Sequence, residues 1–107
     1  LENALDKGWV KYKAGTYEIE VEAGTAELMV AMFNYNKKGV VPPSKIALYG
    51  KGRKWTLIQE VQAPKWENTN HDTFVDHVIF SDIPSDVRKL KLVFTVEKES
   101  YIHLIRK

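Results

Sequence analysis

Residues 26–49 read Ala-Glu-Leu-Met-Val-Ala-Met-Phe-Asn-Tyr-Asn-Lys-Lys-Gly-Val-Val-Pro-Pro-Ser-Lys-Ile-Ala-Leu-Tyr, and this stretch decides the fold. The apolar run over 28–33 has no polar position on either face of an extended chain, which predicts a strand over 26–35 that is buried on both faces. Such a strand is expected in the interior of a sheet. A polar loop that ends in Pro42 and Pro43 follows, and a second strand is predicted over 45–49.

Two segments on either side of this stretch, 15–21 and 89–96, alternate between apolar and polar residues. Alternation is typical of a strand with one buried face and one wet face. The predicted strands are 9–12, 15–21, 26–35, 45–49, 54–61, 74–80, 89–96 and 101–105. Turns are predicted between them, among others at 50–53 and at 98–100. About eight short strands without a long helix indicate an all-β protein, an antiparallel β-sandwich or jelly roll.

Length and composition narrow the class of protein further. With 107 residues, 44% of them hydrophobic, the chain is expected to form a single domain over 1–107. The net charge of +2 argues against a nucleic-acid partner, and no apolar run approaches the roughly 20 residues of a membrane span. Cysteine is absent, which excludes a disulfide framework and cysteine-ligated zinc. The sequence opens on Leu1-Glu2-Asn3 without a methionine, so it is interpreted as a fragment of a larger protein.

The long polar loop over 62–73 contains the first candidate ligand site. Sugar sites combine an aromatic face, which stacks on pyranose C–H groups, with amide, imidazole or charged groups that bond hydroxyls. The loop supplies both kinds of group in Trp66, Asn68, Asn70 and His71. The alternative is a plain loop whose tryptophan packs on the sandwich edge and whose asparagines cap turns.

A second candidate site lies in the loop that follows the buried strand. It is formed by Asn34, Tyr35, Asn36, Lys37 and Lys38. Tyr35 could stack on a sugar ring, and Lys37 or Lys38 could bond hydroxyl groups or a carboxylate. The alternative is an ordinary solvated loop. Arg53 would join either site only if its turn lies at the same end of the sandwich.

Nothing in the sequence resembles an active site or a metal site. There is no Gly-x-Ser-x-Gly motif, and the acidic residues alternate along a wet strand face or are scattered over turns. The three histidines, His71, His77 and His103, lack the spacing of a zinc site. Trp9 and Trp55 are interpreted as core or edge packing. No catalytic residue, no metal ligand and no enzymatic activity are therefore predicted.

Taken together, several segments resemble a known family. They are the strand ending Leu28-Met29-Val30-Ala31-Met32-Phe33, the loop ending Pro42-Pro43, the run Lys45-Ile46-Ala47-Leu48-Tyr49-Gly50, the following Trp55, and the last strand Tyr101-Ile102-His103-Leu104. Over about 17–105 the chain resembles the discoidin-like, galactose-binding-like β-sandwich. It is most similar to the C-terminal accessory domains of bacterial chitobiases and β-N-acetylhexosaminidases.

The resemblance implies a non-catalytic accessory domain of an exported glycoside hydrolase, in the periplasm, at the cell surface or secreted. Its partners would be a glycan, bound weakly through the end loops, and the catalytic domain of the same chain. Calcium, which some members carry, is suggested by the resemblance alone, and no other cofactor is expected. The alternative is a structural spacer or protein-interaction sandwich without a sugar site. A nucleic-acid-binding domain would need one basic stripe formed by Lys37, Lys38, Lys51, Arg53, Lys54 and Lys65.

Overall fold

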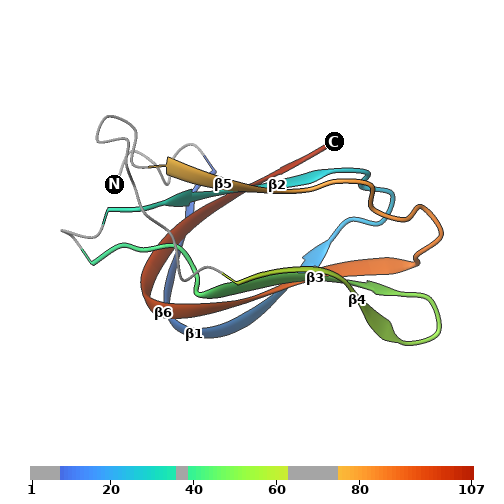
Figure 1. Cartoon of the computed structure of the whole chain (residues 1–107), viewed down its shortest axis with the longest axis horizontal. Helices are drawn as coiled ribbons and strands as arrows, with labels where there is room; N and C mark the ends of the chain where they lie inside the picture. Colours follow the sequence, from blue (N-terminus) through green and yellow to red (C-terminus); the bar gives the residue numbers. More distant parts are fainter. Residues whose placement is uncertain (1–7, 36–38, 63–74) are drawn as a thin grey trace.

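The computed structural model describes residues 8–35, 39–62 and 75–107, which consist of β-strands and their connections (Figure 1). The strands are β1 (Val10–Val21), β2 (Leu28–Phe33), β3 (Lys45–Lys51), β4 (Trp55–Gln62), β5 (Val75–Phe80) and β6 (Lys89–Arg106). Every strand pairing is antiparallel. The predicted all-β class is confirmed, whereas the finer assignment to a jelly roll or galactose-binding-like fold stays a prediction.

The 18-residue strand β6 connects all parts of the sheet. One of its edges pairs with β1 from Leu90 to Ile102. Its other edge pairs first with β3, from Lys89 to Thr95, and then with β2, from Ile102 to Arg106. Since β4 pairs with β3 and β5 pairs with β2, the strand order is β4-β3-β6-β2-β5. The sheet therefore divides into two halves that share β1 and β6.

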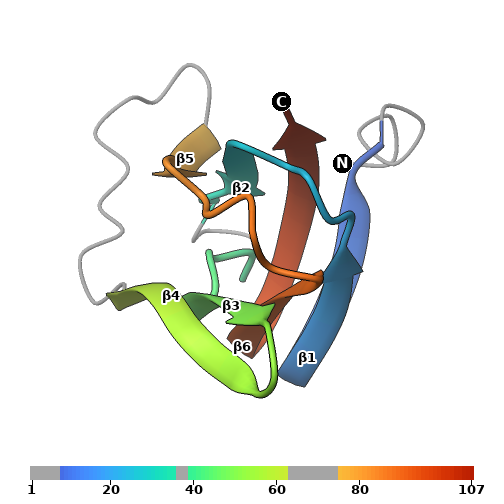
Figure 2. The same ribbon diagram turned by 90° about the vertical axis from the view of Figure 1, so that its right-hand side faces the viewer.

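These two halves fold over each other into a nearly closed, sandwich-like structure. Figure 1 shows β2 and β5 in an upper layer and β3 and β4 in a lower layer, with β1 and β6 curving from one layer to the other. In the end view of Figure 2, β4 and β5 are the outermost strands of the two layers, on the side away from β1, which is itself an edge strand because among the described strands it pairs with β6 alone. Each layer has an inner face toward the other layer and an outer face toward solvent.

The predicted turn at 98–100 is wrong, and so is the break between strands 9–12 and 15–21. Both segments lie within continuous strands, so the eight predicted strands become six. The two segments are neighbours in the sheet, because Lys13 pairs with Glu99 and Gly15 with Val96, with a register shift between them. β6 has one more residue than β1 in this interval, and an extra residue of this kind bends a strand. The polar residues thus mark a bend between layers and not a chain reversal.

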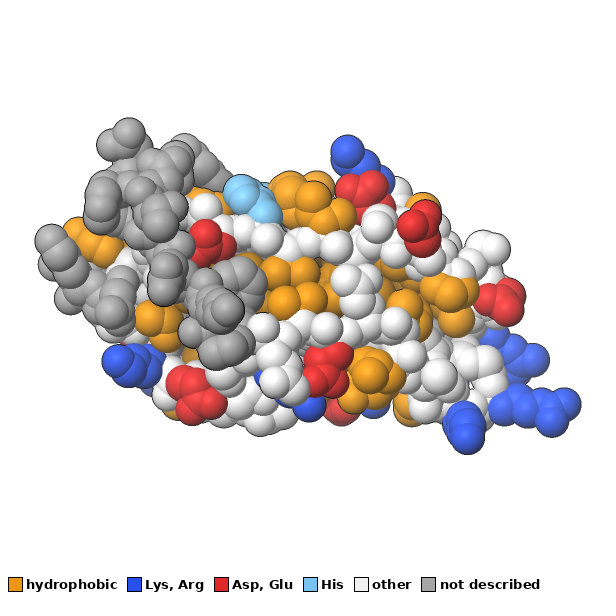
Figure 3. Space-filling view, viewed as in Figure 1, with side chains coloured by type: hydrophobic (Ala, Val, Ile, Leu, Met, Phe, Trp, Pro, Cys, Tyr) orange, Lys and Arg blue, Asp and Glu red, His pale blue; other side chains and the backbone are white. Residues whose placement is uncertain are grey.

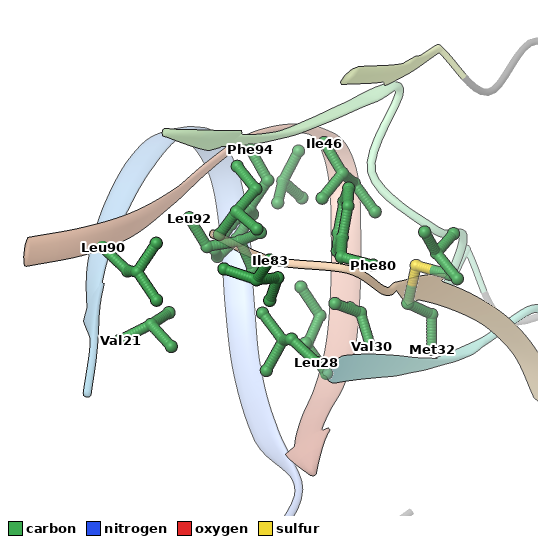
Figure 4. Packing of buried hydrophobic residues seen from close by; sticks show 14 residues of the cluster. Val21, Leu28, Val30, Met32, Ile46, Phe80, Ile83, Leu90, Leu92 and Phe94 are labelled. Atoms are coloured by element: carbon green, nitrogen blue, oxygen red, sulfur yellow. The ribbon is translucent and has the colours of Figure 1, made fainter. Parts of the chain in front are cut away.

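The core lies between the two layers (Figure 4). Leu28, Val30 and Met32 of β2 are fully buried there, as the sequence predicts. The predicted burial of the opposite face is only partly confirmed, because Met29 and Phe33 are half-buried on the outer face of the layer. β6 contributes the alternating set Leu90, Leu92, Phe94 and Val96, and β3 contributes Ile46 and Leu48. β2 also has the predicted interior position, between β5 and β6. Each large apolar side chain buried in this way contributes about 1.5–3 kcal/mol relative to an exposed one.

Trp9 and Trp55 do not belong to this core. Each is half-buried on the outer face of a layer, so Trp55, for which core or edge packing is predicted, points away from the core. The reason is a register shift between Leu48 and Tyr49 in the β3–β4 pairing. Beyond this shift the outward positions of β4 carry Trp55 and Leu57, of which Leu57 is 45% exposed, while Ile58 packs against the core.

Candidate functional site

The site predicted in the 62–73 loop lies almost wholly outside the described residues. Trp66, Asn68, Asn70 and His71 are among the residues that the structure does not describe, as are Asn36, Lys37 and Lys38 of the second predicted site. The described boundaries of the long loop are Gln62 at the end of β4 and Val75 at the start of β5. Sugar binding through these residues stays a prediction.

Two of the described candidates, Tyr35 and Arg53, lie at opposite ends of the molecule. Tyr35 follows β2 and forms a short antiparallel bridge with Val40, before the chain enters β3 at Lys45. Arg53 lies in the turn that follows Lys51 at the other end of β3 (Figure 1). The two side chains therefore do not contribute to one site.

A different cluster gathers on the outer face of the lower layer. Its side chains come from four adjacent strands: Glu18 and Glu20 of β1, Lys89 and Lys91 of β6, Tyr49 and Lys51 of β3, and Trp55 of β4. Register explains why they meet. Lys91 pairs with both Glu20 and Tyr49, and Lys51 pairs with both Lys89 and Trp55, so these positions share one face of the sheet.

Lys91 is the centre of this cluster. Its Nζ atom lies 2.9 Å from the Glu18 carboxylate oxygen Oε1 and 4.4 Å from the centroid of the Trp55 ring. The ring of Tyr49 is 5.7 Å from the same ammonium group, and Lys51 Nζ lies 5.8 Å from the Trp55 ring. An ammonium group is attracted both by a carboxylate and by the negative face of an aromatic ring. These contacts therefore fix the positions of Lys91, Glu18 and Trp55 relative to one another.

A hollow of about 260 Å³ opens beside these side chains. It is lined by Glu18, Ile19, Glu20, Trp55, Lys89, Leu90 and Lys91. The volume is just below the range of about 300–1,000 Å³ that is usual for small-molecule pockets, so this is a shallow surface site. Its wall offers an apolar indole, two carboxylates that accept hydrogen bonds and two ammonium groups that donate them.

The outer face of the upper layer is mostly apolar and aromatic. Trp9 stacks on Phe33 and contacts His103, with ring centroids 4.3 Å and 5.5 Å apart respectively. Ile79 of β5 is 50% exposed beside Met29 of β2, with which it pairs. Figure 3 shows apolar side chains next to a histidine along the upper side of the molecule. This face, called the upper apolar face below, consists of Trp9, Met29, Phe33, His77, Ile79, Tyr101, His103 and Ile105.

Within 8–35, 39–62 and 75–107, no three His, Asp or Glu side chains gather closely enough to hold a metal ion. The same residues contain no helix long and apolar enough to cross a membrane. Tyr12 is the one described group with a clearly shifted pKa, which burial and the nearby Tyr17 raise above its ordinary value.

The sequence alone does not predict the cluster around Trp55, although it contains one signal of it. Alternation placed Glu18, Glu20, Lys89 and Lys91 on outer faces, but it does not tell which strands are neighbours. No protein-family model matches the chain, and no curated protein matches it significantly.

Proposed function

We propose that this chain is a non-catalytic carbohydrate-binding module that holds a sugar against Trp55 on the outer face of β4, β3, β6 and β1. The observation that supports this proposal is the hollow, in which one indole stands beside two carboxylates and two ammonium groups. An aromatic surface contacts the apolar faces of pyranose rings, and the charged groups around it hydrogen-bond hydroxyls. This combination suits a sugar better than a purely apolar ligand.

The geometry favours weak but pre-organised binding. Lys91 is held between Glu18 and Trp55, and its side chain is only 21% exposed. Little side-chain conformational entropy is therefore lost at Lys91 when a ligand binds. Glu20 and Lys89 line the same hollow and can reach hydroxyl groups at its rim. Because the site is shallow, one sugar unit is expected to bind with a Kd of about 1 mM, and several units in a row more tightly.

The wider role follows from the resemblance described above. In that role the module is an accessory domain of an exported glycoside hydrolase, and its weak binding raises the concentration of the enzyme at its polymeric substrate. The catalytic chemistry would belong to another domain of the same protein.

Titration calorimetry and tryptophan fluorescence with GlcNAc, chitobiose, chitohexaose and galactose test the proposal. Wild-type protein is expected to give a saturable signal that Trp55→Ala abolishes. Leu57→Ala is the matched control, because Leu57 also lies on the outer face of β4 but does not line the hollow. Binding that survives Trp55→Ala and disappears in Trp66→Ala would move the site to the 62–73 loop, and no binding at millimolar sugar would refute the proposal.

A second candidate function is docking onto a neighbouring domain through the upper apolar face. The observation that favours it is the 50% exposure of Ile79 next to a surface of half-buried aromatic and aliphatic side chains. Hydrogen exchange on the longer protein tests it. Docking predicts slower exchange in β5 and in the second half of β6 when the neighbouring domain is present. Equal exchange rates with and without that domain would exclude it.

A further inference from the structure

One end of the molecule concentrates positive charge around Trp55. Six cationic side chains lie in or next to the β3–β4 turn: Lys51, Arg53, Lys54, Arg88, Lys89 and Lys91. The backbone holds these segments together, since the Arg88 N–H donates a hydrogen bond to the Lys51 carbonyl oxygen at 2.8 Å and Lys51 pairs with Lys89. Figure 3 shows Lys and Arg side chains gathered at this end of the molecule. These six residues are called the basic end below.

Most of this charge has no counter-charge in the described part of the chain. The ion pairs there involve Lys11, Lys45, Lys91 and Arg106, so Lys91 is the only member of the basic end with a carboxylate partner. Lys51 and Lys89 are directly opposite each other on neighbouring strands, where like charges repel. Four carboxylates lie close by in the sheet or the sequence: Glu18, Glu20 and Glu22 in or next to β1, of which Glu22 pairs with Arg106, and Asp86 two residues before Arg88. The basic end thus carries a local excess of positive charge larger than the net +2 of the whole chain.

We propose that the ligand of this module is an acidic glycan, a chain of pyranose rings that carries carboxylate or sulfate groups. This inference rests on the proposed function, because one sugar ring occupies the hollow at Trp55. The anionic groups on that ring and its neighbours then bind Lys51, Lys89 and the side chains of the turn. The positive field of the basic end attracts such a polymer. The module is therefore expected to bind an acidic glycan more tightly than a neutral one of the same length.

The composition of the hollow favours a glycan over a nucleic acid. Glu18 and Glu20 line the same hollow as Trp55, where they can accept hydrogen bonds from the several hydroxyl groups of a pyranose ring, donors that the backbone of single-stranded DNA lacks. Single-stranded nucleic acids are held by successive aromatic side chains along a basic groove. Among the described residues that line the hollow, Trp55 is the single aromatic side chain.

The test compares four ligands by titration at about 0.02 M and about 0.3 M salt, where charge interactions are screened to different extents. The ligands are a galacturonate hexamer, a sulfated dextran oligomer of similar length, neutral chitohexaose and a short single-stranded oligonucleotide. At low salt at least one acidic glycan is expected to bind more tightly than chitohexaose, and the difference should largely disappear at high salt. The two acidic ligands distinguish carboxylate from sulfate recognition.

Paired variants assign the effect to the basic end. The double variant Arg53→Gln, Lys54→Gln, at two exposed turn positions that do not line the hollow, should weaken acidic-glycan binding about 10-fold at low salt and leave chitohexaose binding unchanged. The control is Lys13→Gln, Lys98→Gln, which removes the same charge from exposed positions at the bend. The control should bind like wild type.

The outcomes separate this inference from the proposed function. Neutral and acidic glycans that bind equally, with both signals lost in Trp55→Ala, would overturn the inference and leave the proposed function intact. The absence of any glycan binding would overturn both. Equal weakening by the two double variants would show that overall charge alone is responsible, and an oligonucleotide that binds more tightly than both acidic glycans would overturn the glycan assignment.

Discussion

The indole of Trp9 lies flat against the ring of Phe33, with the ring centroids 4.3 Å apart and the planes 7° from parallel. Trp9 immediately precedes β1, and Phe33 ends β2, two strands that are separated in the sheet by β6. The pair therefore spans β6 on the outer face, above His103 and Tyr101. The stacking contact therefore holds the residue that precedes β1 against the upper layer.

A double-mutant cycle should measure this contact. Phe33→Ala is expected to lower the free energy of unfolding by about 2 kcal/mol, which is less than for a fully buried phenylalanine. Trp9→Ala should also destabilise the protein, but the double variant should lose about 0.5–1.5 kcal/mol less than the sum of the single losses. Urea unfolding gives the three values. Strictly additive losses would show that the stacking contributes nothing.

Gly50 occupies a position in β3 where no side chain fits. A Cβ atom there would lie 2.8 Å from both Ile58 Cδ1 and Val87 Cγ1. Gly50→Ala is therefore expected to reduce the free energy of unfolding by about 1–3 kcal/mol, since overpacking displaces these side chains. Gly52→Ala in the adjacent turn is the control, because nothing lies within 4 Å of its added methyl group. Equal stabilities of the two variants in chemical denaturation would contradict the prediction.

The buried amide of Asn34 depends on a carboxylate in β5. Asn34 is 5% exposed, and its Nδ2 atom donates a hydrogen bond of 2.8 Å to Asp76 Oδ2. Asp76→Ala removes this acceptor and should cost about 1–3 kcal/mol of stability. Asp76→Asn keeps an acceptor oxygen and should recover part of the loss, while His77→Ala at the exposed neighbouring position should be nearly neutral. Thermal unfolding of the three variants tests this order.

Stability should fall at alkaline pH in part because of Tyr12. Burial, and secondarily the charge of Tyr17, raise the pKa of Tyr12 above its ordinary value of 10.0. The folded state therefore holds this proton more tightly than the unfolded state, so the contribution to stability is complete below pH 10 and is lost as the pH rises through the folded-state pKa.

Comparison with Tyr12→Phe isolates this effect from other alkaline titrations. The variant keeps the aromatic ring, whose edge contacts Phe94 at a centroid distance of 4.9 Å, but it has no proton to lose. Between about pH 9 and about pH 11 it should lose less unfolding free energy than wild type. Parallel curves of stability against pH for the two proteins would disprove the prediction.

Local patterns in the sequence predicted the fold class and most of the buried positions. The doubly apolar run over 28–33 and the alternation of Leu90, Leu92, Phe94 and Val96 were sufficient for this. The same patterns failed at 13–14 and 97–100, where polar residues lie at a bend within paired strands. A turn and an exposed bend have similar compositions, and only the pairing of β1 with β6 distinguishes them.

The candidate site was harder to predict, because it depends on contacts that are distant in the sequence. Glu18 and Trp55 line one hollow only because β6 and β3 lie between β1 and β4 in the sheet. The outward direction of Trp55 depends further on the register shift after Leu48. Neither the strand order nor this register shift can be predicted from local sequence patterns.

The position of β6 in the sheet has a consequence for biosynthesis. β1, β2 and β3 all pair with β6, which is synthesised after every one of them. While the ribosome is still translating the preceding residues, the earlier strands have no common partner, and the two layers have nothing to join them. Folding of this domain should therefore begin late and proceed slowly, because it requires pairings between distant segments. Until then, the apolar strand β2 is exposed to chaperones and to other nascent chains.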